Sequence, residues 1–133
     1  MPPEHADPTR PAAWLRRARS NLARARAGQT APDVLFEDLC FDAQQAAEKA
    51  IKAVLVHHQI PFPKTHQITQ LLTLAEQQAV AVPAEVREAA TLTQYAVESR
   101  YPGFGEDVTR EEYDRALVLA NVVVRWASDL LGS

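Results

Sequence analysis

The stretch that decides the fold is residues 33–58, DVLFEDLCFDAQQAAEKAIKAVLVHH. At 100° per residue, its leucines, alanines and Val54 share one broad arc, and acidic, amide and lysine side chains occupy the opposite side. This pattern predicts a long amphipathic helix from about Asp33 to His58. The alanines indicate that neighbouring helices approach it closely. The predicted apolar arc consists of Leu35, Leu39, Ala43, Ala46, Ala50, Ala53 and Val54.

The segments on either side of this stretch also show helical periodicity. Gly28 ends the first predicted helix, Thr65 is a suitable N-cap for the third, and Thr109 and Glu112 have the spacing of a capping box. No segment alternates with period two, so we expect an all-α, up-and-down antiparallel bundle of four to five helices. The further helices are predicted over residues 11–27, 66–79, 83–99 and 109–131.

Apolar stripes at α-helical spacing predict which faces of these helices are buried. The centre of the last helix, residues 117–127, is apolar on nearly all sides, so we expect another chain to cover part of it. The first helix carries Trp14, Ala18, Leu22 and Ala25, and the fourth carries Val86, Ala89, Ala90, Thr93, Ala96 and Val97.

With 133 residues the chain has the length of one domain, and we expect residues 1–10 to be a disordered lead-in to a domain over residues 11–133. Cys40 is the single cysteine, which excludes an intramolecular disulfide and favours a reducing compartment. The N-terminus lacks the features of a secretory signal, and no stretch has the apolar length of a membrane span. We therefore expect a cytoplasmic protein that does not enter a membrane.

Charge is distributed unevenly along the chain. The net charge is −3, which argues against indiscriminate coating of nucleic acid. Between Pro8 and Pro32, however, there is no acidic residue. This asymmetry indicates either an anionic partner for the first helix or a face neutralised by acidic neighbours in the fold. The arginines of this segment are Arg10, Arg16, Arg17, Arg19, Arg24 and Arg26.

Three short motifs occur in order along the chain. They are CFDAQQAAEKAIKA at residues 40–53, PKTH at residues 63–66 before Leu71 and Leu72, and SRYP at residues 99–102. In this order and spacing, over about residues 14–131, the chain resembles the HEPN domain family. The resemblance implies a helical bundle that usually forms a symmetric dimer. Many members bind a minimal nucleotidyltransferase encoded with them, and many are metal-independent ribonucleases or toxins.

The ribonuclease members use an Arg-x(4–6)-His motif that faces its second copy across the dimer interface. Arg100 matches the arginine, and it either faces a cleft or pairs with a buried carboxylate. Where the histidine would follow, the sequence has Gly105, Glu106 and Asp107. Glu106 or Asp107 could replace it only as a poor proton donor near neutral pH, and His66 would have to approach through folding. We therefore expect no ribonuclease activity.

The polar side of the 33–58 helix permits two interpretations. Gln45, Lys49 and Lys52 form either a solvated face or, together with Arg100 and Tyr101, the lining of a dimer cleft for a nucleotide or phosphate. The apolar Phe41 and Val56 on the same side, with Arg125 of the last helix, predict a dimer or partner interface.

These observations predict a dimeric HEPN domain that binds a minimal nucleotidyltransferase in a toxin–antitoxin-like module and is not itself an enzyme. We expect no cofactor and no metal, because no set of side chains has metal-ligand spacing. Two alternatives remain open. One is a metal-independent RNase toxin using Arg100 with a substitute acid–base residue, and the other is an RNA- or nucleotide-binding module that uses the arginine-rich first helix.

Overall fold

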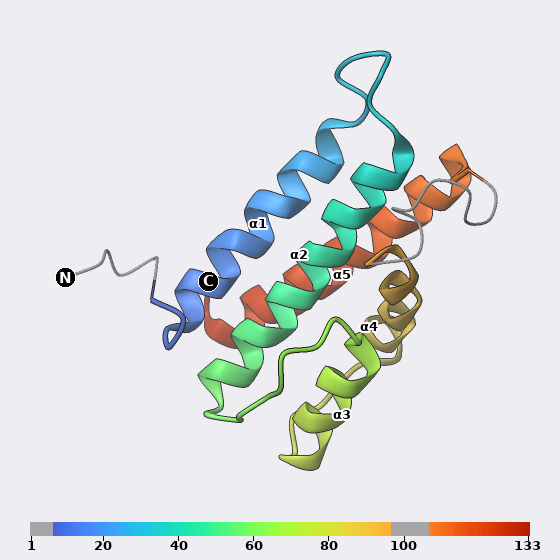
Figure 1. Cartoon of the computed structure of the whole chain (residues 1–133). Helices are drawn as coiled ribbons and strands as arrows, with labels where there is room; N and C mark the ends of the chain where they lie inside the picture. The colour runs from blue at the N-terminus through green and yellow to red at the C-terminus, as the bar shows by residue number, and fades with distance from the viewer. Residues whose placement is uncertain (1–6, 97–106) are drawn as a thin grey trace.

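A computed structural model describes residues 7–96 and 107–133, and Figure 1 shows its helical arrangement. These residues contain no strand, which confirms the all-α prediction. None of the helices in the described ranges combines the length and apolar character needed to cross a bilayer. In chain order the elements are α1 (Pro11–Ala27), α2 (Phe36–His57), α3 (Ile68–Gln77), α4 (Ala84–Arg87), the 3₁₀ helix η2 (Glu88–Tyr95) and α5 (Arg110–Leu131).

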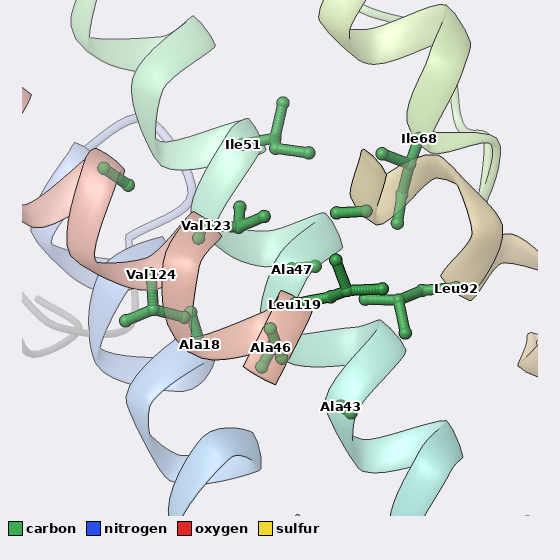
Figure 2. Close-up of a cluster of buried hydrophobic side chains, with 14 of the residues drawn as sticks. Ala18, Ala43, Ala46, Ala47, Ile51, Ile68, Leu92, Leu119, Val123 and Val124 are labelled. Carbon is green, nitrogen blue, oxygen red and sulfur yellow. The ribbon is translucent and has the colours of Figure 1, made fainter. Parts of the chain in front are cut away.

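Helix α2 is the centre of the bundle. It packs against α1 along one side and against α5 behind it, while α3 and the α4–η2 segment flank its other side (Figure 1). Alanines allow this close approach, since Ala46, Ala47, Ala50 and Ala53 are fully buried. Figure 2 shows where α2 meets its neighbours: Ala47 and Ile51 lie beside Val123 and Leu119 of α5, and Leu119 points toward Leu92 of η2.

Both ends of α1 and the start of α5 follow local sequence signals. Helix α1 has Pro11 in its first turn and ends at Ala27 before Gly28, whose φ of 72° suits glycine. Helix α5 begins with the predicted capping box, in which Thr109 and Glu112 satisfy each other's backbone N–H groups. Both predicted helices are confirmed at these ends.

Helix α2 starts later than predicted. Its N-cap is Leu35, which is 56% exposed, so its assignment to the buried arc was wrong. The predicted helix began too early. Residues 33–35 precede α2, so the 100° spacing that assigned Leu35 to the buried arc does not apply to it. Residues 7–10, the described part of the predicted lead-in, form a turn in which the Pro8 carbonyl accepts a hydrogen bond from the Trp14 indole.

Helix α3 also starts later than predicted. Thr65 is not its N-cap: the Thr65 hydroxyl accepts a hydrogen bond from the Gln67 N–H, within an extended segment before the helix. The Ile68 N–H instead donates to the hydroxyl of Thr93 in η2, 3.2 Å away. His66 therefore lies outside the helix, not in its first turn as predicted.

The predicted fourth α-helix is mostly a 3₁₀ helix. Only Ala84–Arg87 is α-helical, and Glu88–Tyr95 forms η2, an unusually long 3₁₀ run. The buried residues change accordingly, because a 3₁₀ helix repeats every three residues. Val86, Ala89, Leu92 and Tyr95 are buried, whereas Ala90, Thr93 and Ala96 of the predicted stripe are only half-buried. Val97 of that stripe is outside the described residues.

Candidate functional site

The predicted polar side of α2 contains a buried charge network centred on Glu48. Its side chain is only 4% exposed. Its carboxylate accepts hydrogen bonds from Gln44 and Lys52, each at 2.9 Å, and lies 2.9 Å from Nδ1 of His66. Gln44 also approaches the His66 carbonyl at 3.5 Å. The connector before α3 is therefore fastened to α2 through His66.

The protonation state of this network follows from its hydrogen bonds. Burial alone would raise the pKa of Glu48, but the hydrogen bonds from Lys52, Gln44 and His66 outweigh it and lower the pKa below its usual value. Glu48 is thus a carboxylate and can only accept, so Nδ1 of His66 carries the proton. The imidazole of His66 is fixed in orientation, while its side chain remains 61% exposed.

Lys52 is enclosed rather than available to a ligand. Its side chain is 10% exposed, and its ammonium lies 5.6 Å from the ring centroids of both Trp14 and Phe62. These two rings contact each other edge to face, with centroids 6.1 Å apart. The cation is stabilised by Glu48 on one side and by two aromatic rings on the other. Lys52 is therefore buried in this chain and is not part of a solvated face, while its assignment to a dimer cleft stays a prediction.

A second polar chain joins α2 to α1. Lys49 donates to Asn21 at 2.8 Å, and Asn21 donates to the carboxylate of Asp42 at 3.1 Å. Arg24 lies 3.4 Å from the other oxygen of Asp42. Burial lowers the pKa of Lys49, and the nearby positive charge of Arg17 lowers it further. The seam between α1 and α2 thus collects cations at its surface.

The other arginines of α1 fall into two groups. On the side facing α5, Arg19 donates to the Ser128 hydroxyl and to the Ser133 carbonyl, and Arg26 donates to Asn121. These contacts tie α1 to the C-terminal half of α5, where a cation also complements the helix dipole. On the other sides, Arg16 and Arg17 have no ion pair or hydrogen bond within the described part of the chain.

The remaining predicted site residues within the described ranges do not form one cluster. Gln45 is half-buried and donates to Gln44 at 2.7 Å, next to the Glu48 network. Phe41 and Val56 are half-buried on α2, and Arg125 is exposed on α5. Asp107 is exposed just before α5. Arg100, Tyr101 and Glu106 lie outside the described residues.

The interpretation of α2 as a face with only solvated polar groups was incomplete in one respect. Asp42 and Glu48 are buried polar groups that the helical wheel placed with the solvated ones. Their signal in the sequence is the row Gln44, Glu48, Lys52 at spacing four, in which each side chain reaches the next. In α1, Asn21 falls inside the apolar stripe, which marks it as a buried partner.

Comparisons with known proteins agree on the family of this fold. The family model of the HEPN domain matches residues 12–130. The crystal structure of ST0689, an archaeal HEPN homologue, is similar with a TM-score of 0.72 and 28% identity, over 91% of this chain and 97% of that one. No curated protein matches the sequence. Among the described residues, no group of three or more His, Cys, Asp or Glu side chains could hold a metal ion.

Proposed function

Because the chain belongs to the HEPN domain family, we propose that it is a dimeric binding partner of a minimal nucleotidyltransferase, in a cytoplasmic module of the toxin–antitoxin kind. Its role is to bind other macromolecules rather than to catalyse a reaction. One observation carries this proposal. Within the described residues, the ionisable side chains of Glu48, Lys52 and His66 contact one another and hold α2 and the α3 connector together.

Glu48 and Lys52 differ from the residues of an active site because a substrate cannot reach them. A general acid or base must come within hydrogen-bond reach of its substrate. Glu48 and Lys52 have side chains that are 4% and 10% exposed, so neither reaches a bound molecule without disruption of the core. The sequence also has Gly105, Glu106 and Asp107 where the ribonuclease motif requires histidine. Both observations support a binding role.

The first experiment recovers the tagged full-length chain from the cells that naturally make it. We expect a nucleotidyltransferase to be recovered with it in stoichiometric amount, identified by mass spectrometry, and to re-form the complex when both proteins are purified separately. Failure of the purified proteins to associate would contradict the proposal.

A metal-independent RNA cleavage assay tests the alternative enzymatic role. The purified chain is incubated with RNA in the presence of a chelator, beside an Arg100→Ala variant prepared identically. We expect no cleavage by either protein. Cleavage by the wild-type chain alone would replace the proposal with an RNase that uses Arg100.

A second candidate function is favoured by the seam between α1 and α2. Arg17, Arg24 and Lys49 lie close together there. Asp42 is the carboxylate that pairs with Arg24 at this seam. Guanidinium groups bind phosphate in a bidentate manner, so this seam suits the phosphates of a nucleotide or of RNA. A phosphate would also relieve the repulsion between Arg17 and Lys49.

The seam is tested by binding of labelled single-stranded RNA and of a mononucleotide, each over a range of salt concentrations. If the seam binds phosphate, the double variant Arg17→Glu, Arg24→Glu weakens binding by about tenfold or more, since each lost phosphate contact to RNA weakens it several-fold. The matched control is Arg87→Glu, Arg115→Glu, which changes the same charge elsewhere, where Glu76 and Glu88 already pair with these arginines. Equal losses in both variants would mean that only total charge matters.

A further inference from the structure

A small cavity lies between η2 and the first half of α5, two elements that pack against each other. Its volume is about 320 Å³, at the lower end of the range for small-molecule sites. Leu92, Ala116 and Leu119 provide its apolar lining, and each of them is at most 3% exposed. Figure 2 shows Leu119 pointing toward Leu92. The cavity is separate from the Glu48 network and from the seam between α1 and α2.

Tyr95 adds a polar atom to this apolar lining. The residue is 5% exposed, and its hydroxyl donates to the Glu112 carboxylate at 3.4 Å. Hydrogen bonds between oxygens usually measure about 2.7–2.8 Å, so this one is weak. Burial raises the pKa of Tyr95 to about 12, which keeps the hydroxyl protonated at neutral pH. Its oxygen can accept a hydrogen bond from a ligand while the O–H group donates to Glu112.

The 3₁₀ form of η2 shapes this side of the cavity. In a 3₁₀ helix the side chains at positions i and i+3 lie directly above one another. Leu92 and Tyr95 have this spacing, and both line the cavity. The more exposed Thr91 and Gln94 have the same spacing and line its rim. One column of η2 is therefore apolar and buried, and the column beside it is polar.

The charges around the cavity favour a cationic ligand. Among the described residues that line it, Glu111 and Glu112 are negative and Arg115 is positive. Arg115 is paired with Glu88 at 2.8 Å. Glu111 has no hydrogen bond or ion pair within the part of the chain that the structure describes. The positive end of the α5 dipole amounts to about half a unit charge, which is less than the charge of the two carboxylates.

Two charged groups near the lining leave this balance negative. Arg110, at the start of α5, lies 3.4 Å from Asp114 and is paired with it. Glu37 of α2 adds a carboxylate on the inner side, where it and Glu112 both raise the pKa of Cys40. The surroundings of the cavity therefore repel an anion and attract a cation.

We propose that this cavity binds a small organic amine. The ammonium group of the amine is held by the carboxylates of Glu111 and Glu112 and donates to the Tyr95 oxygen. The apolar body of the amine lies against Leu92 and Leu119. The site is a further binding site of the chain, and it does not depend on the partner role proposed above.

Isothermal titration calorimetry of the full-length chain tests the charge preference with phenethylamine, 2-phenylethanol and 3-phenylpropionate. These probes share a phenyl ring and are positive, neutral and negative at neutral pH. We expect phenethylamine to bind at least about tenfold more tightly than the other two, because only an ammonium gains charge-assisted hydrogen bonds from carboxylates. The proposal is overturned if the amine shows no saturable binding, or if the alcohol or the acid binds equally well.

A pair of variants on α5 separates the cavity from general effects of charge. Glu111→Gln removes an exposed carboxylate without a change of shape, and we expect it to weaken phenethylamine binding by about fivefold. The matched control is Asp129→Asn, which makes the same charge change at an exposed site about 27 Å along α5, at about 1.5 Å per residue. At that distance its charge is screened, so we expect a change within about twofold. Equal losses in both variants would overturn the proposal.

Two further measurements locate the bound amine. Tyr95→Phe keeps the ring and removes the hydroxyl, and we expect it to weaken phenethylamine binding by about fivefold. Thermal unfolding shows that this variant is folded. In the wild-type chain, we expect phenethylamine to shift the amide resonances of residues 91–95 and 111–119. Unchanged affinity in folded Tyr95→Phe, or shifts confined to other elements, would contradict the assignment.

Discussion

Glu48 is the residue on which the described site depends most. It accepts hydrogen bonds from side chains of its own helix and from the connector before α3, and it neutralises Lys52 in the interior. Removing one partner of a buried ion pair leaves the other charge unpaired, which destabilises a protein much more than loss of an exposed pair. The stability of the fold and the fixed orientation of His66 therefore both depend on the Glu48 carboxylate.

We expect Glu48→Gln to lower the free energy of unfolding by about 3 kcal/mol, because Lys52 would remain buried without a counter-charge. Chemical denaturation followed by circular dichroism measures this change. The control is Asp38→Asn on the exposed side of the same helix, for which we expect a change within about 0.5 kcal/mol. Equal effects of the two substitutions would show that the network contributes nothing particular to stability.

The stability of wild type and of Glu48→Gln should depend on pH differently, and the sign of the difference is defined. The folded-state pKa of Glu48 lies below its usual value of 4.5, so its contribution to stability is complete above that value. It is lost as pH falls through the lowered folded pKa. Wild type should therefore lose stability on acidification below pH 4.5 more steeply than Glu48→Gln. Parallel curves for the two proteins would contradict this assignment.

Cys40 is buried, and this determines its reactivity. Burial raises the pKa of its thiol to about 12, with further increases from the charges of Glu112 and Glu37. Relative to the usual 9.0, the thiolate population at mildly alkaline pH falls by about a thousandfold, at tenfold per pKa unit. We expect a maleimide to label native Cys40 only on unfolding, whereas a cysteine at exposed Ser20 should react at once. Rapid labelling of native Cys40 would show that α2 opens readily.

At the scale of elements, two helices end without the glycine that usually stops them. Gln59 after α2 and Ala79 after α3 have φ of 59° and 65°, in the left-handed region. In each case the next residue, Ile60 or Val80, donates back five residues along the chain and packs in the core. This is the Schellman arrangement, here formed by residues that adopt it at a cost.

Substitution of glycine should relieve that cost. We expect Ala79→Gly to raise the free energy of unfolding by about 0.5 kcal/mol, because relief of left-handed strain exceeds the added entropy of the unfolded chain. The opposite control is Ala23→Gly on the exposed face of α1, which should lower the free energy by about 0.5–1 kcal/mol. Denaturant titration measures both. Loss of stability in Ala79→Gly would contradict the explanation.

Local signals predicted some elements better than others. Pro11 and Gly28 marked the ends of α1, and Thr109 with Glu112 marked the start of α5, because these signals act through neighbouring backbone atoms. The start of α3 was not predictable in this way. The Ile68 N–H donates to the Thr93 hydroxyl, 25 residues away. The Thr65 hydroxyl, which was expected to cap the helix, instead accepts from the Gln67 N–H before the helix begins.

The 3₁₀ form of η2 has a similar cause. Val86, Ala89, Leu92 and Tyr95 recur every three residues, and the sequence permits the spacings of three and four equally well over so short a segment. Burial against α2 and α5 selects the tighter helix. Packing against other elements therefore determines the helix type of this segment, which sequence periodicity alone leaves open.

At the scale of the whole molecule, the chain has a net negative charge, yet α1 and its seam with α2 are rich in arginine and lysine. The sequence predicted this asymmetry, while the role of Gln45, Lys49 and Lys52 in binding stays a prediction. It did not predict that Lys52 would be enclosed by Trp14 and Phe62, because those three residues come from separate parts of the chain. The fold was therefore predictable from local patterns, whereas the burial within the site depended on which elements meet.

The central claim is that this HEPN domain acts as a dimer bound to a nucleotidyltransferase. Native mass spectrometry of the complex recovered with the tagged full-length chain tests it most directly, because one spectrum gives both the number of copies and the partner. We predict two copies of this chain together with the nucleotidyltransferase. A single copy without that enzyme, at concentrations where the tagged chain is intact and folded, would contradict the claim.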